Sequence, residues 1–264
     1  MPFVATRDGT RLFVNDWGTG KPVLLSHGWP MNGDMWEYQM PALVAAGFRC
    51  IAMDRRGFGR SDHPGGGYDF DTFADDLAAV LTALDLRAVT LVGYSMGAGE
   101  ISHYLARHGA TRVASAVLIG GAMSPMDEAM AGMMSQLIAA DRPQFMTDGV
   151  PALFAATAGE PVSAAQMQWV VGLALQASPL ATLACLRAFG QNDFRSELAA
   201  FTMPTLVIHG DADGSQPVAV ARDVAQAIPG AQYVEYAGAP HGLFLTERTR
   251  LAGDLVCFAR GGST

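Results

Sequence analysis

A serine flanked by glycines is the residue of this chain best suited to covalent chemistry. Ser95 is the centre of the segment Gly93–Gly97, which reads Gly-Tyr-Ser-Met-Gly and joins an apolar run to a helix-like one. Small residues on both sides of the serine permit a sharp strand-to-helix turn that holds its hydroxyl clear of a sheet. Amides at the start of the following helix can stabilise an anion. The pattern predicts that Ser95 is a nucleophile rather than an idle serine in a glycine-rich turn.

A serine nucleophile needs a base, and the chain offers six histidines for that role. His241 lies in a loop just after an apolar run at Gln232–Tyr236. The carboxyl end of a strand is where the base of an α/β protein should lie, so His241 is the predicted base. The other five histidines are predicted to be structural or peripheral. His27 lies in a loop that it shapes, and His63 lies in an exposed loop. His103 and His108 lie on the helix after Ser95, and His209 lies at a strand end.

Two aspartates compete to orient the base. Asp211 and Asp213 both follow the apolar run that ends at His209. Asp211 is nearer the end of that run and could simply cap the turn. Asp213 lies further out, where it can reach a histidine on the neighbouring loop. The predicted acid is therefore Asp213.

A loop after the third apolar run can supply one donor for an oxyanion. The segment Ser26–Pro30 reads Ser-His-Gly-Trp-Pro, and a tetrahedral intermediate needs two fixed amide donors. We predict the amides of Trp29 and Met96 for this role. Pro30 has no amide proton and stiffens the loop, while His27 is predicted to shape it.

Strand and helix patterns alternate on both sides of a purely helical stretch. The predicted strands are Phe3–Thr6, Arg11–Trp17, Val23–Ser26, Phe48–Met53, Ala88–Val92, Val113–Ile119, Thr205–His209 and Gln232–Tyr236. The predicted helices are Met35–Ala46, Asp71–Leu84, Met96–Arg107, Val218–Ile228 and Leu245–Ala259. This alternation indicates a parallel sheet covered on both faces. Residues 122–200 carry no convincing strand, so they are predicted to form a helical cap on a core of residues 1–121 and 201–264.

Composition narrows the classes of function. Of 264 residues half are hydrophobic and 16% are charged, with a net charge of −8, which favours one large folded domain and disfavours nucleic acid or an anionic membrane as partner. The three cysteines, Cys50, Cys185 and Cys257, are widely spaced, which argues against a disulfide framework or a zinc site. The chain shows neither a secretory signal nor an apolar run of ~18 residues, so a cytoplasmic location is expected.

Five segments together resemble the α/β-hydrolases of the arylesterase and cofactor-free haloperoxidase (perhydrolase) group. They are Ser26–Pro30, Asp54–Ser61, Gly93–Gly97, His209–Asp213 and Ala239–Gly242. The chain order Ser, Asp, His is also that of this fold. The resemblance implies a mostly parallel eight-stranded sheet with helices on both faces and a helical cap inserted after the sixth strand. It implies a triad of Ser95, Asp213 and His241, no metal or other cofactor, and arginines of Asp54–Ser61 that tie loops together.

The resemblance and the apolar composition together predict a substrate class. Side chains expected to line the pocket are Trp29, Met96, Met123, Phe145, Phe154 and Phe189. Few cations lie in the predicted cap, so small aryl or short-chain alkyl carboxylic esters are the expected partners, with hydrogen peroxide competing with water for the acyl-enzyme. The sequence leaves assembly into homo-oligomers open.

Related activities are separated by single positions. Haloalkane dehalogenases and epoxide hydrolases have an aspartate where this chain has Ser95, so both are disfavoured. A carbon–carbon bond hydrolase and a small-molecule receptor that retains the triad stay open as alternatives. After Asp213 the resemblance implies an aliphatic pair, but the chain has Gly214, Ser215 and Gln216, so the substrate preference of the resembled group is not carried over.

Overall fold

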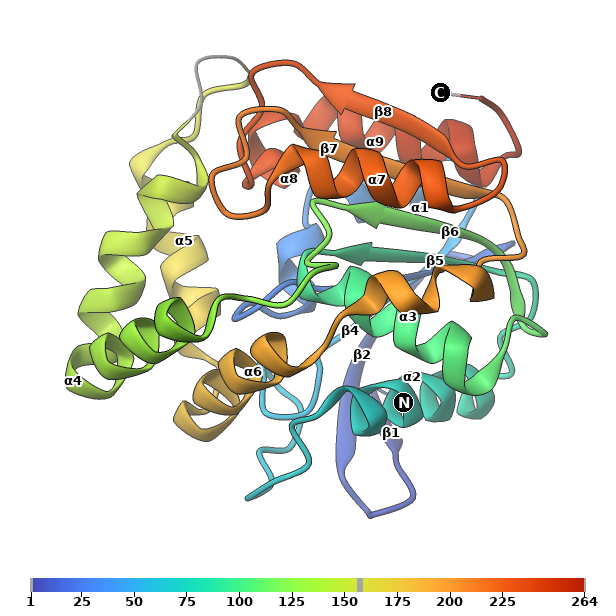
Figure 1. Ribbon diagram of the computed structural model, residues 1–264. Helices are drawn as coiled ribbons and strands as arrows, with labels where there is room; N and C mark the ends of the chain where they lie inside the picture. Colours follow the sequence, from blue (N-terminus) through green and yellow to red (C-terminus); the bar gives the residue numbers. More distant parts are fainter. Residues whose placement is uncertain (1, 156–158, 264) are drawn as a thin grey trace.

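Eight strands form one sheet in residues 2–155 and 159–263, the part of the chain that the computed structural model describes (Figure 1). The strands run in the order β1-β2-β4-β3-β5-β6-β7-β8. Only the pairs β1/β2 and β2/β4 are antiparallel. Their bounds are β1 Phe3–Ala5, β2 Arg11–Trp17, β3 Pro22–Ser26, β4 Arg49–Met53, β5 Val89–Tyr94, β6 Val113–Ile119, β7 Thr205–Gly210 and β8 Gln232–Tyr236. The predicted eight-stranded, mostly parallel sheet is therefore confirmed.

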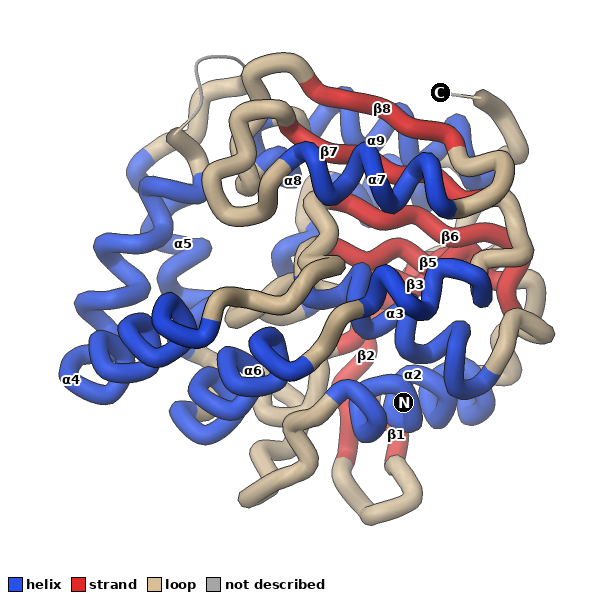
Figure 2. The backbone as a smooth tube through the Cα atoms, viewed as in Figure 1, coloured by secondary structure: helices blue, strands red, loops and turns tan. Residues whose placement is uncertain are grey.

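Helices cover both faces of the sheet (Figures 1 and 2). Alternate residues of β3 show the two layers, because Leu24 packs into one apolar cluster and Val23 and Leu25 pack into another. The first cluster includes residues of α2, α3 and α7, and the second includes residues of α1, α8 and α9. Central strands with apolar residues on both faces are typical of such a parallel sheet. The helix bounds are α1 Gln39–Ala45, α2 Phe70–Ala83, α3 Met96–His108, α7 Val218–Ala227, α8 Leu243–Thr246 and α9 Arg248–Ala259.

Two predicted helices are each divided in the structure. The prediction of one helix over Met35–Ala46 is wrong: a 3-10 turn, η1 Gly33–Trp36, precedes α1. Pro41 explains the break, since proline has no N–H for the preceding turn and is tolerated only near a helix start.

The prediction of one last helix over Leu245–Ala259 is also wrong, because α8 and α9 meet at Glu247 with φ −119° and ψ 26°. The Thr246 carbonyl accepts the amide of Glu160 at 2.5 Å. In one continuous helix the Thr246 carbonyl would accept the amide four residues further on. Its bond to Glu160 takes the place of that helical hydrogen bond.

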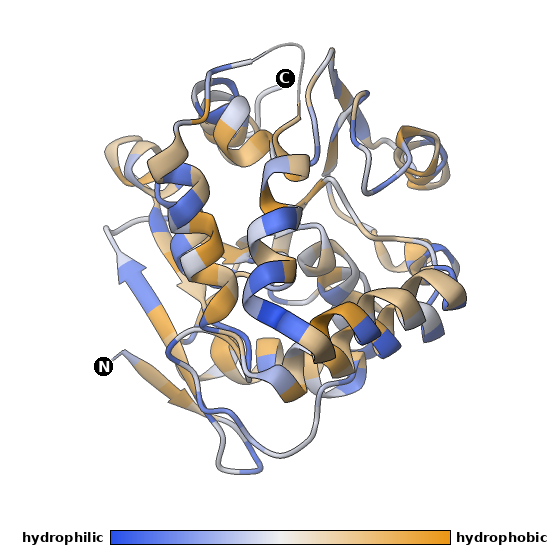
Figure 3. Cartoon of the chain, turned by 90° about the vertical axis from the view of Figure 1, so that its left-hand side faces the viewer, coloured by the Kyte–Doolittle hydropathy of each residue, from blue (hydrophilic) through white to orange (hydrophobic). Residues whose placement is uncertain are grey.

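Only helices are found between β6 and β7 in residues 122–155 and 159–200; residues 156–158 of the predicted cap lie outside the described part. They are α4 Glu128–Leu153, α5 Ala164–Leu175, α6 Pro179–Gln191 and the 3-10 helix η2 Phe194–Ala200. The helices α4, α5 and α6 lie beyond the carboxyl ends of the strands (Figure 1), and Figure 3 looks onto this side, where hydrophilic and hydrophobic residues alternate along the helices. Within the described residues no single helix is long and apolar enough to cross a membrane; α5 and α6 would pass only as a pair bent by 90°.

Candidate active site

The turn at Ser95 is strained and tightly enclosed. β5 ends at Tyr94 and α3 begins at Met96, with Ser95 between them at φ 52° and ψ −115°. A positive φ at a non-glycine residue costs about 1–3 kcal/mol and points to a functional constraint. A Cβ atom added at Gly93 would lie 2.4 Å from the Gly97 carbonyl oxygen, and one added at Gly97 would lie 2.4 Å from the Ser26 carbonyl oxygen. Only glycine fits at either position.

Three side chains from three loops form a continuous hydrogen-bonded chain. His241 Nε2 lies 3.2 Å from Ser95 Oγ, and His241 Nδ1 lies 2.7 Å from Asp213 Oδ2. Asp213 follows β7 and His241 follows β8, so neighbouring parallel strands deliver both to the same edge of the sheet. Ser95 and His241 are each 7% exposed, and the Asp213 side chain has no exposed area. The structure thus brings together the three predicted residues.

The Asp213 carboxylate is held as an anion. Burial raises its pKa, but hydrogen bonds from His209 and His241 lower it by more, so the pKa lies well below the ordinary range. Oδ1 also accepts the amides of Ser215 and Gln216, both at 2.8 Å. An anionic acceptor at Oδ2 requires the proton of His241 to lie on Nδ1, which leaves Nε2 free to accept the serine proton.

The competing aspartate has a different role. Asp211 Oδ1 accepts the amide of Gly238 at 2.5 Å, which joins the loop after β7 to the loop after β8. This contact is structural, as the sequence allowed, although it bridges two loops rather than capping its own turn.

The two predicted oxyanion donors lie on different elements, Trp29 in the loop after β3 and Met96 at the start of α3. Within the described residues the backbone N–H groups of Trp29 and Met96 have no protein acceptor. The Trp29 side chain is held by α6, because its Nε1 donates to the Thr182 carbonyl at 3.1 Å. The peptide bond between Trp29 and Pro30 is cis. A Cβ atom added at Gly28, the residue before Trp29, would lie 3.2 Å from Ser95 Cβ, and stabilisation of an oxyanion requires free amides near the serine.

A buried ion pair lies beneath this loop. Arg55 and Glu100 both have 0% exposure, and Glu100 Oε2 accepts Arg55 Nη2 at 2.5 Å and Nε at 2.8 Å. Arg55 Nη2 also donates to the His27 carbonyl at 2.9 Å, and Ser26 Oγ donates to Glu100 Oε2 at 2.8 Å. The pair therefore joins the loop that carries Trp29 to α3, the helix that begins directly after Ser95.

The other histidines have contacts of their own. His27 is fully buried, its Nε2 accepts the Arg55 amide at 3.0 Å, and burial together with the Arg55 charge holds its pKa well below the usual value. His103 and His108 on α3 contact carboxylates of α2, and His103 also contacts Glu197. His63 is exposed.

A comparison with models of protein families identifies the family of this chain. The family model described as the alpha/beta hydrolase fold matches residues 21–248. The chain belongs to the α/β-hydrolase family.

Individual relatives show which group within the family this chain resembles. It is 42% identical to the non-heme chloroperoxidase CPO-A1 of Kitasatospora aureofaciens, over 98% of this chain and 99% of that protein. It is 34% identical to the bifunctional esterase/perhydrolase DCH of Acinetobacter calcoaceticus, over 98% and 100%. An esterase from Exiguobacterium antarcticum has a similar structure, with a TM-score of 0.94, 33% identity and 98% coverage of both chains. The predicted resemblance to the haloperoxidase and esterase group is confirmed.

The side chains predicted to line a pocket lie in different surroundings. Phe189 of α6 contacts the Trp29 ring edge-on, with centroids 6.5 Å apart. Met123 is buried just after β6, where Ala122 donates its amide to the Ser95 carbonyl. Phe154 packs against Phe244 directly beside the loop of His241. Phe145 lines a hollow of about 380 Å³ on the surface of α4.

Three candidate functional residues were not predicted from the sequence. The Tyr94 hydroxyl donates to the His241 carbonyl at 2.8 Å, and the rings of the two residues lie 5.1 Å apart. Glu100 is the charged residue among the mostly apolar buried residues of α3, a signal that the sequence did contain. His209 contacts Asp213, whereas the sequence predicted for it only a structural or peripheral place.

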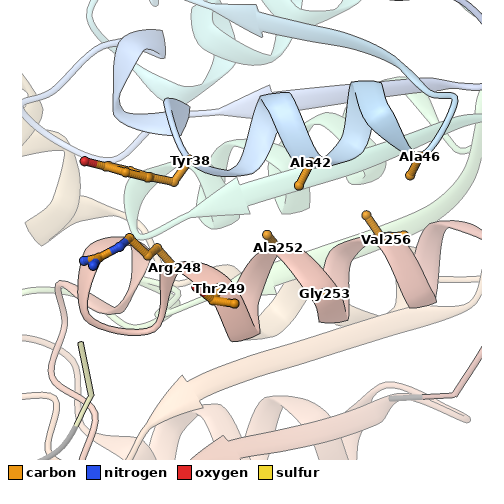
Figure 4. Close-up of a pocket in the computed structure, with 8 residues that line it drawn as sticks. All are labelled: Tyr38, Ala42, Ala46, Arg248, Thr249, Ala252, Gly253 and Val256. Atoms are coloured by element: carbon orange, nitrogen blue, oxygen red, sulfur yellow. The ribbon is translucent and has the colours of Figure 1, made fainter.

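A separate hollow of about 410 Å³ lies between α1 and α9 of the hydrolase (Figure 4). Ala42 and Ala46 face Ala252, Gly253 and Val256 across it. Its lining does not include Ser95, Asp213 or His241.

Proposed function

We propose that the chain is a serine esterase that cleaves small aryl or short-chain alkyl carboxylic esters through an acyl-enzyme. The observation that carries this proposal is the buried chain Ser95–His241–Asp213, with a 3.2 Å and a 2.7 Å contact, at a strained strand-to-helix turn. Relatives named esterase and esterase/perhydrolase support it.

The geometry gives each group a step. His241 Nε2 takes the hydroxyl proton of Ser95 as Oγ attacks the ester carbonyl carbon, and Asp213 stabilises the imidazolium that forms. The amides of Trp29 and Met96 donate to the oxyanion. His241 then protonates the leaving alcohol, which departs as the acyl-enzyme forms. Water, deprotonated by His241, attacks the acyl carbon and releases the acid, and Ser95 recovers its proton.

A side perhydrolase activity follows from the same site. If hydrogen peroxide replaces water, His241 takes its proton, the hydroperoxide oxygen attacks the acyl carbon, and Ser95 leaves with the proton. The product is a peracid, which can oxidise halide. Relatives named non-heme chloroperoxidase and bifunctional esterase/perhydrolase support this second outcome.

We propose residues 122–200 as the cap that encloses the substrate, on a core of residues 1–121 and 201–264. The cap contains three arginines. Arg142 donates to the Ala177 carbonyl, Arg195 pairs with Asp193, and Arg187 lines a surface hollow beside the loop of Gly65–Gly67. None of these contacts involves the triad, which favours neutral esters over anionic ones.

The deciding experiment compares Ser95→Ala with Ser102→Ala on p-nitrophenyl acetate. Ser102 is buried on the same helix and donates to the Ala98 carbonyl, so it is a matched control. We expect Ser95→Ala to lose ~10⁴-fold or more in kcat and Ser102→Ala to keep most of it. Near-normal turnover by Ser95→Ala would refute the proposal.

Substrate class is tested by a panel of p-nitrophenyl esters of increasing acyl length, each assayed with and without hydrogen peroxide. A steep fall in kcat/KM beyond short acyl chains, with peracid formed in the peroxide arm, supports a small closed pocket. A rate that rises with acyl length contradicts it. Faster cleavage of a dienoate-type diketone than of any ester would instead identify a carbon–carbon bond hydrolase.

A further inference from the structure

A second histidine contacts the triad acid at the same carboxylate oxygen as His241. His209 is the fifth residue of β7 and is 1% exposed. Its Nε2 lies 3.3 Å from Asp213 Oδ2, the same oxygen that accepts His241 Nδ1 at 2.7 Å. The proposed mechanism gives His209 no step, so its position needs a separate explanation.

The contacts of His209 settle which nitrogen carries its proton. Nε2 also lies 2.9 Å from the Gln216 carbonyl oxygen, so both of its neighbours are acceptors and Nε2 must be the donor. Nδ1 is buried and has no partner among the described residues. A proton on Nδ1 would be a buried donor without an acceptor, which is costly. His209 therefore carries a proton on Nε2, where it faces the Gln216 carbonyl at 2.9 Å and Asp213 Oδ2 at 3.3 Å.

The shared N–H closes a ring of hydrogen bonds around the acid. Gln216 donates its amide to Asp213 Oδ1 at 2.8 Å and offers its carbonyl to His209. The loop after Asp213 is thus held both to the carboxylate and to β7. This loop contains Gly214, Ser215 and Gln216.

We propose that His209 is a positioning residue that fixes the rotation of the Asp213 carboxylate, so that Oδ2 faces His241, and that shares the charge of Oδ2 between two imidazoles. The role depends on the proposed function of the triad. Other ionisable groups that act on this pair are Tyr94 of β5 and Glu235 of β8, the latter paired with Arg222 at 2.8 Å.

The test compares His209→Leu, which removes the donor, with His209→Gln, whose amide nitrogen can take the place of Nε2. His63→Leu, at an exposed histidine, is the control. We expect kcat of His209→Leu to fall about tenfold, as for the loss of one weak hydrogen bond to a charged group, with KM changed little. In His209→Leu the Asp213 carboxylate would interact more strongly with His241. The acid limb of the pH profile, where kcat/KM falls as pH is lowered, therefore moves to higher pH. His209→Gln should restore most of kcat and the original limb.

A readout independent of turnover separates this proposal from the proposed function. The low-field proton resonance of the His241 Nδ1–H reports its bond to Asp213 even in an inactive protein. We expect this resonance to shift or broaden in His209→Leu and to return in His209→Gln. If Ser95→Ala kept its turnover, the esterase proposal would fail, and this resonance would still test the contact.

Two results would overturn the role of His209. One is a His209→Leu variant with the kcat, pH profile and Nδ1–H resonance of the parent protein. The other is equal impairment of His209→Leu and His209→Gln, with losses that follow the fraction of folded protein and an unmoved acid limb, since that would show a packing role only.

Discussion

Replacing Glu100 by glutamine tests whether the buried ion pair with Arg55 holds the loop of Trp29 to α3, the helix that follows Ser95. Glu100 Oε2 accepts three hydrogen bonds within 2.5–2.8 Å, two from Arg55 and one from Ser26. Glutamine keeps the shape and one acceptor oxygen but removes the negative charge. Arg55, with 0% exposure, is then a buried cation without a counter-charge.

The magnitude follows from distance and burial. Unit charges 2.5 Å apart attract by about 7 kcal/mol at an effective dielectric constant of ~20, and the retained amide dipole recovers part of this. Removing one partner of a buried pair typically costs about 3–5 kcal/mol. At about 3 °C per kcal/mol for a chain of this size, Tm should fall by roughly 10–15 °C. Since Arg55 also holds the His27 carbonyl, kcat on an aryl ester should fall at least ~10-fold.

The assay is thermal unfolding by circular dichroism at neutral pH together with ester kinetics below the transition. Glu235→Gln, which breaks the surface pair with Arg222, is the matched control and should leave Tm nearly unchanged. The double variant Arg55→Met/Glu100→Met should be more stable than Glu100→Gln, because no unpaired charge is left in the core. A Glu100→Gln variant with parental Tm, or a double variant less stable than the single one, would refute the reasoning.

Two further predictions concern Tyr94 and a histidine far from the triad. Tyr94→Phe loses the 2.8 Å hydrogen bond to the His241 carbonyl, so kcat should fall about tenfold with KM nearly constant, and steady-state kinetics showing an unchanged kcat would contradict this. Burial lowers the pKa of His103, but its bonds to Asp71 and Glu197 raise it by more, to above the ordinary value. Its stabilising contribution is therefore complete below pH ~6.5 and is lost as pH rises through the raised pKa. The Tm difference between the parent protein and His103→Gln should thus shrink between about pH 6 and pH 9, and a constant difference would exclude the effect.

What the sequence predicted well was encoded locally. Apolar runs of strand length marked every strand to within two residues, because central parallel strands are buried on both faces. Ser95 was recognisable because two glycines must flank a turn of this sharpness. The one avoidable error in the core was the helix over Met35–Ala46, since Pro41 is visible in the sequence and proline starts helices more readily than it continues them.

What the sequence did not predict depends on contacts between distant residues. Arg55 and Glu100 are separated by 45 positions, and only the folded chain shows that their charges meet. The division at Glu247 follows from a hydrogen bond between Thr246 and Glu160, 86 positions earlier in the chain. The direction of the His209 ring depends on the fold of the loop at Gln216. The pocket-lining roles of Met123, Phe145, Phe154 and Phe189 stay predictions.

The contact between the end of α4 and the loop of His241 restricts how this protein can be re-engineered. The Leu153 carbonyl at the end of α4 accepts the Gly242 amide at 2.6 Å, and a Cβ atom added at Gly242 would lie 2.2 Å from the Phe154 ring. Libraries that vary Phe154 to widen the substrate range are therefore expected to disturb the neighbouring loop of His241 as well. Diversity is better placed at Met123 and Phe189, which lie near the nucleophile and the oxyanion loop, so that changes in selectivity can be separated from damage to the base.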